Sequence, residues 1–127
     1  MEEELNSVSD PLTYKIISCC YEVHKELGPG YLEKIYSRAL MIQLGNQGLS
    51  YECEREFNVY FKGKFVGKFR CDFFIEGKVI LEIKAITGIQ PKLFQTQLLS
   101  YLKASKSKTG LLVNFGNTSC EVKRLSN

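Results

Sequence analysis

The chain has 127 residues, 44% of them hydrophobic and 24% charged, with a formal net charge of +3. This length and apolar content predict one domain over residues 1–127 with a real core. Within that range, residues 1–9 are expected to be a flexible N-terminus. No run of about 18 apolar residues occurs, and the acidic start is unlike a signal peptide, which argues against a membrane protein and favours a cytoplasmic one.

Cysteine usage and charge distribution add two expectations. The five cysteines include no CxxC pair, so we expect reduced core thiols rather than a zinc site: Cys19, Cys20, Cys53, Cys71 and Cys120.

Residues 1–60 carry 5 basic and 10 acidic side chains, whereas residues 61–127 carry 12 basic and 4 acidic ones. The second half is therefore the candidate phosphate-facing surface, although such a split also occurs on ordinary solvated surfaces.

Two helices are predicted first. Asp10-Pro11 is a helix start, and apolar residues at helical spacing extend the helix over residues 11–27. His24, the single histidine, is expected to be a packed or capping residue. A Gly-Pro-Gly break at 28–30 precedes a second helix from Tyr31 to about Gln47. Glu33 falls in its first turn, where the helix dipole favours a carboxylate.

Three strands, a helix and two strands follow. Residues 51–61, 65–75 and 79–84 are predicted to form a β-meander. After a loop at 87–90, Pro91 opens a helix to about Ala104, with an apolar side formed by Phe94, Leu98, Leu99 and Leu102. Residues 109–115 predict a buried strand and 120–125 an edge strand. The predicted order is α-α-β-β-β-α-β-β.

The central stretch, residues 70–84, alternates in character. It joins the predicted strands 65–75 and 79–84. In both strands the odd-numbered positions are apolar, beginning with Phe65, and the even-numbered positions carry the charges. The apolar faces of the two strands can share one core only if odd-numbered residues of one strand pair with odd-numbered residues of the other. This pairing requires a three-residue loop or a bulge at Gly77. This register places Asp72, Glu82 and Lys84 on one side of the sheet.

Two carboxylates and an amine in apolar strands are costly unless they are paired or bind a metal. Carboxylates with this separation suit Mg²⁺ or Mn²⁺, which bind through one or two carboxylates plus a substrate phosphate. Lys84 would then orient the attacking water or stabilise the transition state. The alternative is a cross-strand salt bridge between Lys84 and the two acids, and spacing alone does not separate these interpretations.

The pattern Asp72, Glu82-x-Lys84 on a meander, followed by a helix and a strand, resembles the PD-(D/E)xK nuclease superfamily. Gln97-x-x-x-Tyr101 is similar to the Gln-x-x-x-Tyr motif of its RecB-like branch. The stretch at residues 24–36, which contains Gly-x-x-Glu-x-x-Tyr, resembles the GxxExxY protein family, as do residues 82–85 and 111–116. The superfamily's usual Pro before the first Asp is absent, because Cys71 precedes Asp72.

The resemblance implies an α/β (α+β) restriction-endonuclease-like fold with an α-β-β-β-α-β core and a central mixed sheet flanked by helices. It also implies a nuclease dependent on Mg²⁺ or Mn²⁺ that cuts nucleic acid; DNA is favoured over RNA as the substrate, but the sequence does not decide between them. Its site would use Asp72 and Glu82, the Ile83 carbonyl and Glu33 for metal, and Lys84, Gln97 and Tyr101 beside them. Candidate phosphate contacts are Lys68, Arg70 and Lys92.

Two other functions stay open. The first is a nucleic-acid- or protein-binding regulatory module that keeps the fold without turnover. The second is a small-molecule phosphoesterase with the same metal chemistry. The chain is short for a nuclease, so a homodimer or a partner protein is also expected.

Overall fold

The computed structural model describes residues 10–127, so the flexible start predicted at 1–9 lies outside the described part. The elements occur in the predicted order, beginning with helices α2 (Pro11–Leu27) and α3 (Glu33–Asn46). They continue with β1 (Tyr51–Phe61), β2 (Lys64–Ile75), β3 (Val79–Lys84), α4 (Lys92–Ser105), β4 (Thr109–Asn114) and β5 (Glu121–Ser126). No helix within residues 10–127 has the length and apolar character needed to cross a membrane.

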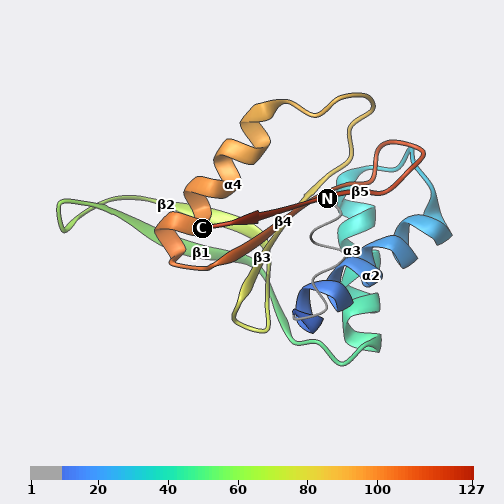
Figure 1. Cartoon of the computed structure of the whole chain (residues 1–127), viewed down its shortest axis with the longest axis horizontal. Helices are drawn as coiled ribbons and strands as arrows, with labels where there is room; N and C mark the ends of the chain where they lie inside the picture. The colour runs from blue at the N-terminus through green and yellow to red at the C-terminus, as the bar shows by residue number, and fades with distance from the viewer. Residues whose placement is uncertain (1–9) are drawn as a thin grey trace.

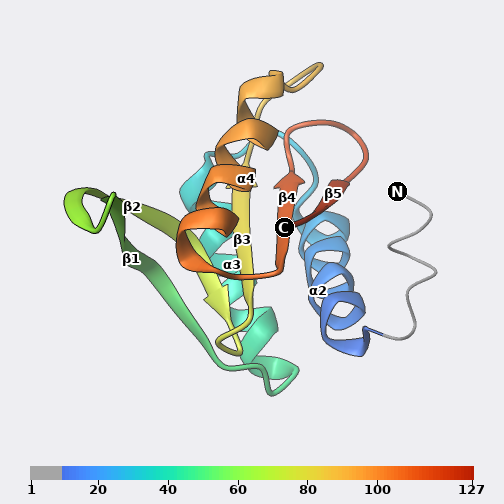
Figure 2. The ribbon, with the colours of Figure 1, turned by 60° about the vertical axis from the view of Figure 1, so that its left-hand side comes forward.

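The strands form one mixed sheet in the order β1-β2-β3-β4-β5. Only β3 and β4 are parallel, because α4 connects them as a crossover, and β5 is an edge strand as predicted. Helices α2 and α3 pack on one face of the sheet and α4 on the other, which gives the predicted helix-flanked α/β fold (Figure 1). Figure 2 shows the β1–β2 hairpin diverging from β3 and extending beyond the helices.

The start of α2 follows from its sequence. The Asp10 side chain caps Thr13, Pro11 supplies the first helical residue, and Gly28 ends the helix at φ +69°. Asp10 also forms a 2.9 Å ion pair with Arg124 of β5. His24 is a packed residue, since its Nε2 lies 2.8 Å from the Asn117 carbonyl oxygen.

The predicted β2–β3 register is confirmed. Phe73 pairs with Leu81 and Ile75 with Val79, and the three residues between the strands form the connecting loop. Gly77 in this loop has φ +62°, as expected for a residue that readily adopts the left-handed region. Asp72 and Glu82 therefore lie opposite each other.

The predicted single apolar face is wrong at one point. Phe73 packs in the core under α2 and α3, whereas Cys71, two residues earlier, packs in the core under α4. Two residues apart should share a face in a regular strand, so β2 changes its facing at Asp72. The ladder with β3 ends there, and Glu54, opposite on β1, has φ +54°. Such irregularities redirect side chains, often beside active sites.

Three positions predicted to be core are exposed. Phe65 is 55% exposed because the outer hairpin extends past the helices, and Leu99 is 43% exposed because α4 turns Leu98 and Leu102 toward the sheet. Cys53 is an exposed thiol, whereas the other four cysteines are buried or half-buried, and all five are free.

Asn114 connects the loops that follow β3 and β4. This residue is fully buried, and its Oδ1 accepts hydrogen bonds from the backbone N–H of Ile86 (2.9 Å) and of Gly116 (3.1 Å). Its Nδ2 donates to the Ile86 carbonyl (3.0 Å) and to Glu121 (3.1 Å). The two loops approach so closely that a Cβ on Gly116 would lie 2.1 Å from the Ile86 carbonyl oxygen.

We expect Gly116→Ala to destabilise the protein by about 2 kcal/mol or more, because backbone rather than a flexible side chain occupies the space. Gly45→Ala is the matched control. That glycine is helical with open space around it, so alanine should stabilise by about 0.5–1 kcal/mol. Urea unfolding measures both, and equal stability of the two variants would contradict the close contact.

Candidate active site

The site lies where β2 separates from β3. Beyond the Phe73–Leu81 pair the two strands are joined by carboxylates rather than by their own peptide groups. The Asp72 N–H donates to Glu82 Oε2 at 2.8 Å, and the Ile83 N–H donates to Asp72 Oδ2 at 2.7 Å. Within residues 10–127, no donor bonds the second oxygen of either carboxylate. Each acid therefore holds the opposite strand with one oxygen and keeps the other available.

Burial and mutual repulsion perturb both acids. Glu82 is 6% exposed, and its burial, followed by the charge of Asp72, raises its pKa to about 8. Burial also raises the pKa of Asp72, opposed by the Ile83 hydrogen bond and by the charge of Lys84. Holding two negative charges this close is unfavourable without a cation. Such perturbed pairs are characteristic of functional sites.

Lys84 does not form the cross-strand salt bridge that the sequence left open. No carboxylate oxygen of residues 10–127 lies within 4.0 Å of its Nζ, which instead lies 4.2 Å from the centre of the Phe94 ring. Its charge still lowers the pKa of both acids, so it is near them without contacting them. The ammonium is therefore held beside the acids and is not neutralised by direct pairing.

Glu33, the first residue of α3, comes from the other side of the same opening. Burial and the charge of Asp72 raise its pKa, whereas the charge of Lys84 lowers it. Glu33 and Asp72 line one groove of about 700 Å³ between α3 and the separated strands. The remaining lining residues are Leu32, Lys34, Ser37, Arg38, Met41, Glu54 and Ile83.

The two α4 residues differ in their surroundings. The Tyr101 ring stacks on Phe69 with centroids 4.1 Å apart, and its pKa is raised by burial and then by the charges of Glu82 and Asp72. Gln97 is exposed and forms no hydrogen bond within residues 10–127. The structure thus brings Tyr101 close to the acids and leaves Gln97 facing solvent.

The predicted phosphate contacts are surface residues. Lys68 pairs with Glu56 at 3.5 Å, and Arg70 pairs with Glu54 at 3.2 Å, all with exposed side chains. Lys92 is exposed at the start of α4. Exposed ion pairs contribute only about 0–1 kcal/mol, so these pairs do not prevent Lys68 or Arg70 from meeting an anion.

Three charged residues of the groove were not among the site residues predicted from the sequence: Lys34, Arg38 and Glu54. Lys34 and Arg38 follow Glu33 on α3 by one and five positions, so both lie within two helical turns of it, and this proximity was a readable signal. The charge of Glu54 contributes to the raised pKa of Asp72, and the positive φ of Glu54 has no signature in the sequence.

The donor set fits Mg²⁺ or Mn²⁺ better than zinc. Within residues 10–127, no group of three or more His, Cys, Asp or Glu side chains is arranged to hold a metal alone. Asp72 and Glu82 nevertheless offer two free carboxylate oxygens. Mg²⁺ binds through one or two carboxylates and completes its shell with water and substrate phosphate, which this arrangement allows.

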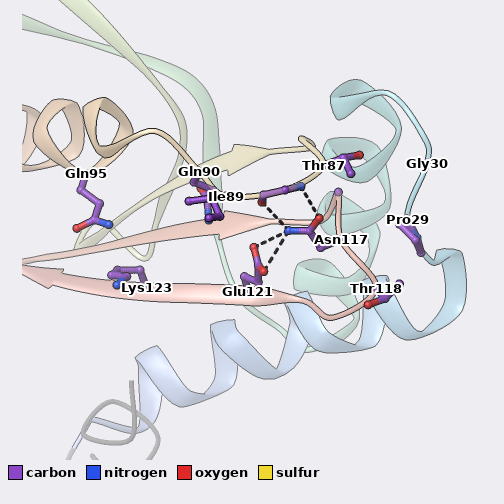
Figure 3. Close-up of a pocket in the computed structure, with 12 residues that line it drawn as sticks. Pro29, Gly30, Thr87, Ile89, Gln90, Gln95, Asn117, Thr118, Glu121 and Lys123 are labelled. Atoms are coloured by element: carbon purple, nitrogen blue, oxygen red, sulfur yellow. Dashed lines mark hydrogen bonds between the residues drawn. The ribbon is translucent and has the colours of Figure 1, made fainter.

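A second pocket, of about 880 Å³, lies among the loops and includes none of the residues predicted for catalysis or metal binding (Figure 3). Asn117 occupies its centre. Its amide bonds both the N–H (2.8 Å) and the carbonyl (2.9 Å) of Gly88, and it donates to Glu121. These polar groups satisfy one another, so this pocket lacks the available acids of the groove.

The fold is a mixed sheet flanked by helices, with two paired acids where β2 separates from β3, and comparison with known proteins identifies the superfamily. Residues 10–125 match the family model described as the PD-(D/E)XK nuclease superfamily, and the chain belongs to that superfamily. No curated protein matches. Among solved structures, the crystal structure of SSO0001 has a similar fold, with a TM-score of 0.59 and 24% identity. The match covers 75% of this chain and 50% of the SSO0001 chain, so this chain spans about half of that protein.

The raised pKa of Glu82 makes the stability of the folded protein depend on pH. The Glu82 carboxyl binds its proton more tightly in the folded state than in the unfolded state, where its pKa is near 4.5. The resulting stabilisation of the folded state is therefore complete below pH 4.5 and is lost toward pH 8. Glu82→Gln, which copies the protonated form, should therefore be more stable than wild type at pH 8.5 and similar at pH 5. Each unit of pKa difference corresponds to about 1.4 kcal/mol.

Urea unfolding in EDTA at both pH values measures this difference, and Glu26→Gln, on the exposed side of α2, is the control. If the difference in unfolding free energy between wild type and Glu82→Gln does not change with pH, the pKa of Glu82 is not raised in the folded state.

Proposed function

We propose that this protein is a metal-dependent nuclease that hydrolyses nucleic-acid phosphodiester bonds, with DNA favoured over RNA as the substrate. One observation carries the proposal. Asp72 and Glu82 hold each other's strands with one oxygen each and leave two hard oxygen donors free beside an unpaired Lys84. Superfamily membership supports the reaction class. The match of residues 24–36 to the GxxExxY pattern further supports placing the chain in that family.

Asp72 and Glu82, with the Ile83 carbonyl and Glu33 as further ligands, would hold Mg²⁺ or Mn²⁺. The ion supplies charge neutralisation on the phosphate and lowers the pKa of a bound water. Glu33 reaches the groove from α3, opposite the two strand acids, so a phosphate between them would have acidic groups on both sides. Such a phosphate is repelled unless a cation accompanies it.

Lys84 orients the water and stabilises charge on the phosphate. The Phe94 ring holds its Nζ by a cation–π contact of 4.2 Å, which fixes the ammonium without consuming its hydrogen-bond donors. Tyr101, fixed by stacking on Phe69, braces the acids or contacts the strand being cut. Gln97, one turn earlier and exposed, is free to contact that strand.

Substrate binding would use the cations around the groove. Lys34 and Arg38 line it, and Lys68, Arg70 and Lys92 extend the positive surface along β2 and the start of α4. Phosphate contacts position a nucleic acid without reading its sequence, so the groove by itself predicts little sequence preference. A homodimer or a partner protein would supply recognition beyond it.

Cleavage of labelled single-stranded DNA, duplex DNA and RNA with Mg²⁺ or Mn²⁺ tests this function. Asp72→Asn keeps an oxygen for the Ile83 N–H, and Lys84→Met keeps the apolar stem. Each should lower the rate at least about 100-fold. Lys78→Met, in the exposed β2–β3 loop, should cut like wild type. Cleavage that persists in Asp72→Asn would contradict the assignment. No cleavage by wild type, with binding retained, would favour the regulatory module.

Metal binding can be measured without turnover. Calorimetric titration with Mn²⁺ should show binding to wild type that weakens about tenfold or more in Asp72→Asn and Glu82→Gln, because each loses a charged oxygen donor. Glu33→Gln should have a smaller effect, since Glu33 is more exposed, and Glu26→Gln should have none. Equal affinities in all variants would place the metal elsewhere.

A further inference from the structure

In the outer part of the β1–β2 hairpin, residues 58–69, the catalytic proposal uses only Lys68 and Phe69, at its inner end. We refer to this part as the hairpin arm. It includes a two-residue turn at Lys62-Gly63, and it projects beyond both helical layers (Figures 1 and 2). Four large apolar residues on the arm are at least half exposed: Tyr60 (59%), Phe61 (62%), Phe65 (55%) and Val66 (61%).

The arm is basic as well as aromatic. It contains Lys62, Lys64 and Lys68 and no Asp or Glu. Within residues 10–127, Lys62 and Lys64 form no salt bridge, and Lys62 Nζ lies 5.4 Å from the centre of the Phe61 ring. The rings of Tyr60 and Phe65 meet edge to face at 6.2 Å. In the chain, exposed rings therefore flank the two available ammonium groups of Lys62 and Lys64.

The sequence of the turn places a charged residue at a position where lysine makes the turn less stable. Lys62 has φ +51° and Gly63 φ +78°, a pair of left-handed residues in a two-residue hairpin loop. Asn-Gly is the usual sequence for such a loop, because asparagine tolerates this conformation better than lysine. A lysine placed there brings a cation to the tip at a cost to the turn.

The charge of the arm indicates which class of ligand it can bind. A second copy would bring another arm with three lysines and no acid, so arm-to-arm contact is repulsive. A nucleic acid supplies phosphates for the lysines and flat bases for the rings. Paired bases within a duplex expose their edges rather than their faces, whereas unpaired bases stack on aromatic side chains.

We propose that the hairpin arm binds an unpaired nucleic-acid strand, with bases stacked on Phe61, Phe65 and Tyr60 and phosphates on Lys62 and Lys64. The proposal deepens the nuclease function and rests on it. Strand β2 runs from the arm directly to Asp72, and nine residues at about 3.3 Å each separate the tip from the acids by roughly 30 Å. Lys68 and Arg70 lie along that path. The preferred substrate thus has a single-stranded segment adjoining the cut.

Binding in EDTA tests the arm without cleavage. Fluorescence anisotropy with a labelled 20-nucleotide oligo-dT, an RNA of the same length and a blunt 20-base-pair duplex gives the affinities. Phe61→Thr/Phe65→Thr should weaken single-strand binding at least tenfold and duplex binding little. Threonine suits an exposed strand, so the hairpin should persist. The ratio of DNA to RNA affinity tells which strand the arm prefers.

The lysines have a matched control. Lys62→Asn/Lys64→Thr removes two charges while giving the turn its favoured Asn-Gly sequence. It should weaken binding and lower the slope of log affinity against log salt by about 1.4, at about 0.7 per phosphate contact. Lys106→Asn/Lys108→Thr makes the same changes elsewhere, and Lys106 also has a positive φ, +61°. This control should keep wild-type affinity and salt slope.

The outcomes separate the two proposals. If both arm variants bind the single strand like wild type, the arm proposal is overturned, and Asp72-dependent cleavage would leave the nuclease intact. If wild type cuts nothing but binds through the arm, the nuclease fails and the arm stands as a nucleic-acid-binding element. If sedimentation shows that the aromatic variant dissociates a dimer and binding is unchanged, the arm is an interface between copies and the proposal is wrong.

Discussion

The reciprocal hydrogen bonds between Asp72 and Glu82 and the opposing strands are the interaction on which the site depends. A continuous β2–β3 ladder would pair these N–H groups with carbonyls and leave no reason for carboxylates to be buried there. Because the ladder ends at Phe73, each carboxylate satisfies one peptide N–H of the other strand. A buried N–H without a partner is costly, so the backbone itself holds the acids together. Their electrostatic repulsion is therefore built into the fold.

The rest of the sheet supports this opening from the other side. The parallel β3–β4 pair continues to the end of β3, where Lys84 pairs with Asn114. The Asn114 amide then fixes both backbone groups of Ile86, two residues beyond Lys84. The strand that carries Glu82 and Lys84 is consequently rigid on its β4 side and open on its β2 side. This asymmetry leaves space for a ligand only where the acids face it.

Much of this arrangement could be predicted from the sequence. The element order follows from hydrophobic periodicity and from turn residues, and the β2–β3 register follows from parity together with Gly77. These features are local, so a short window contains the information that specifies them. Whether Lys84 forms a salt bridge or stays free could not be predicted from neighbouring residues in the sequence, because it depends on the position of Phe94 on the next helix.

Other features could not be read in this way. The change of face at Asp72 coincides with the end of the β2–β3 ladder, and the positive φ of Glu54 on the neighbouring strand has no local signal. Phe65 and Leu99 are apolar at positions that fit a core pattern, but exposure is decided by which elements cover them. Alternation shows which residues share a face and does not show whether that face is covered.

The Asp10–Arg124 ion pair has a consequence for how such a domain combines with others. It joins the residue that caps α2 to the last strand at 2.9 Å, although 114 positions separate them in the sequence. A unit whose entry and exit points touch can be inserted into a host loop with little distortion of either partner. SSO0001, where a similar fold takes up half of a longer chain, shows that this architecture also exists within a larger protein. Modular transfer between polypeptides is thus compatible with the geometry of this fold.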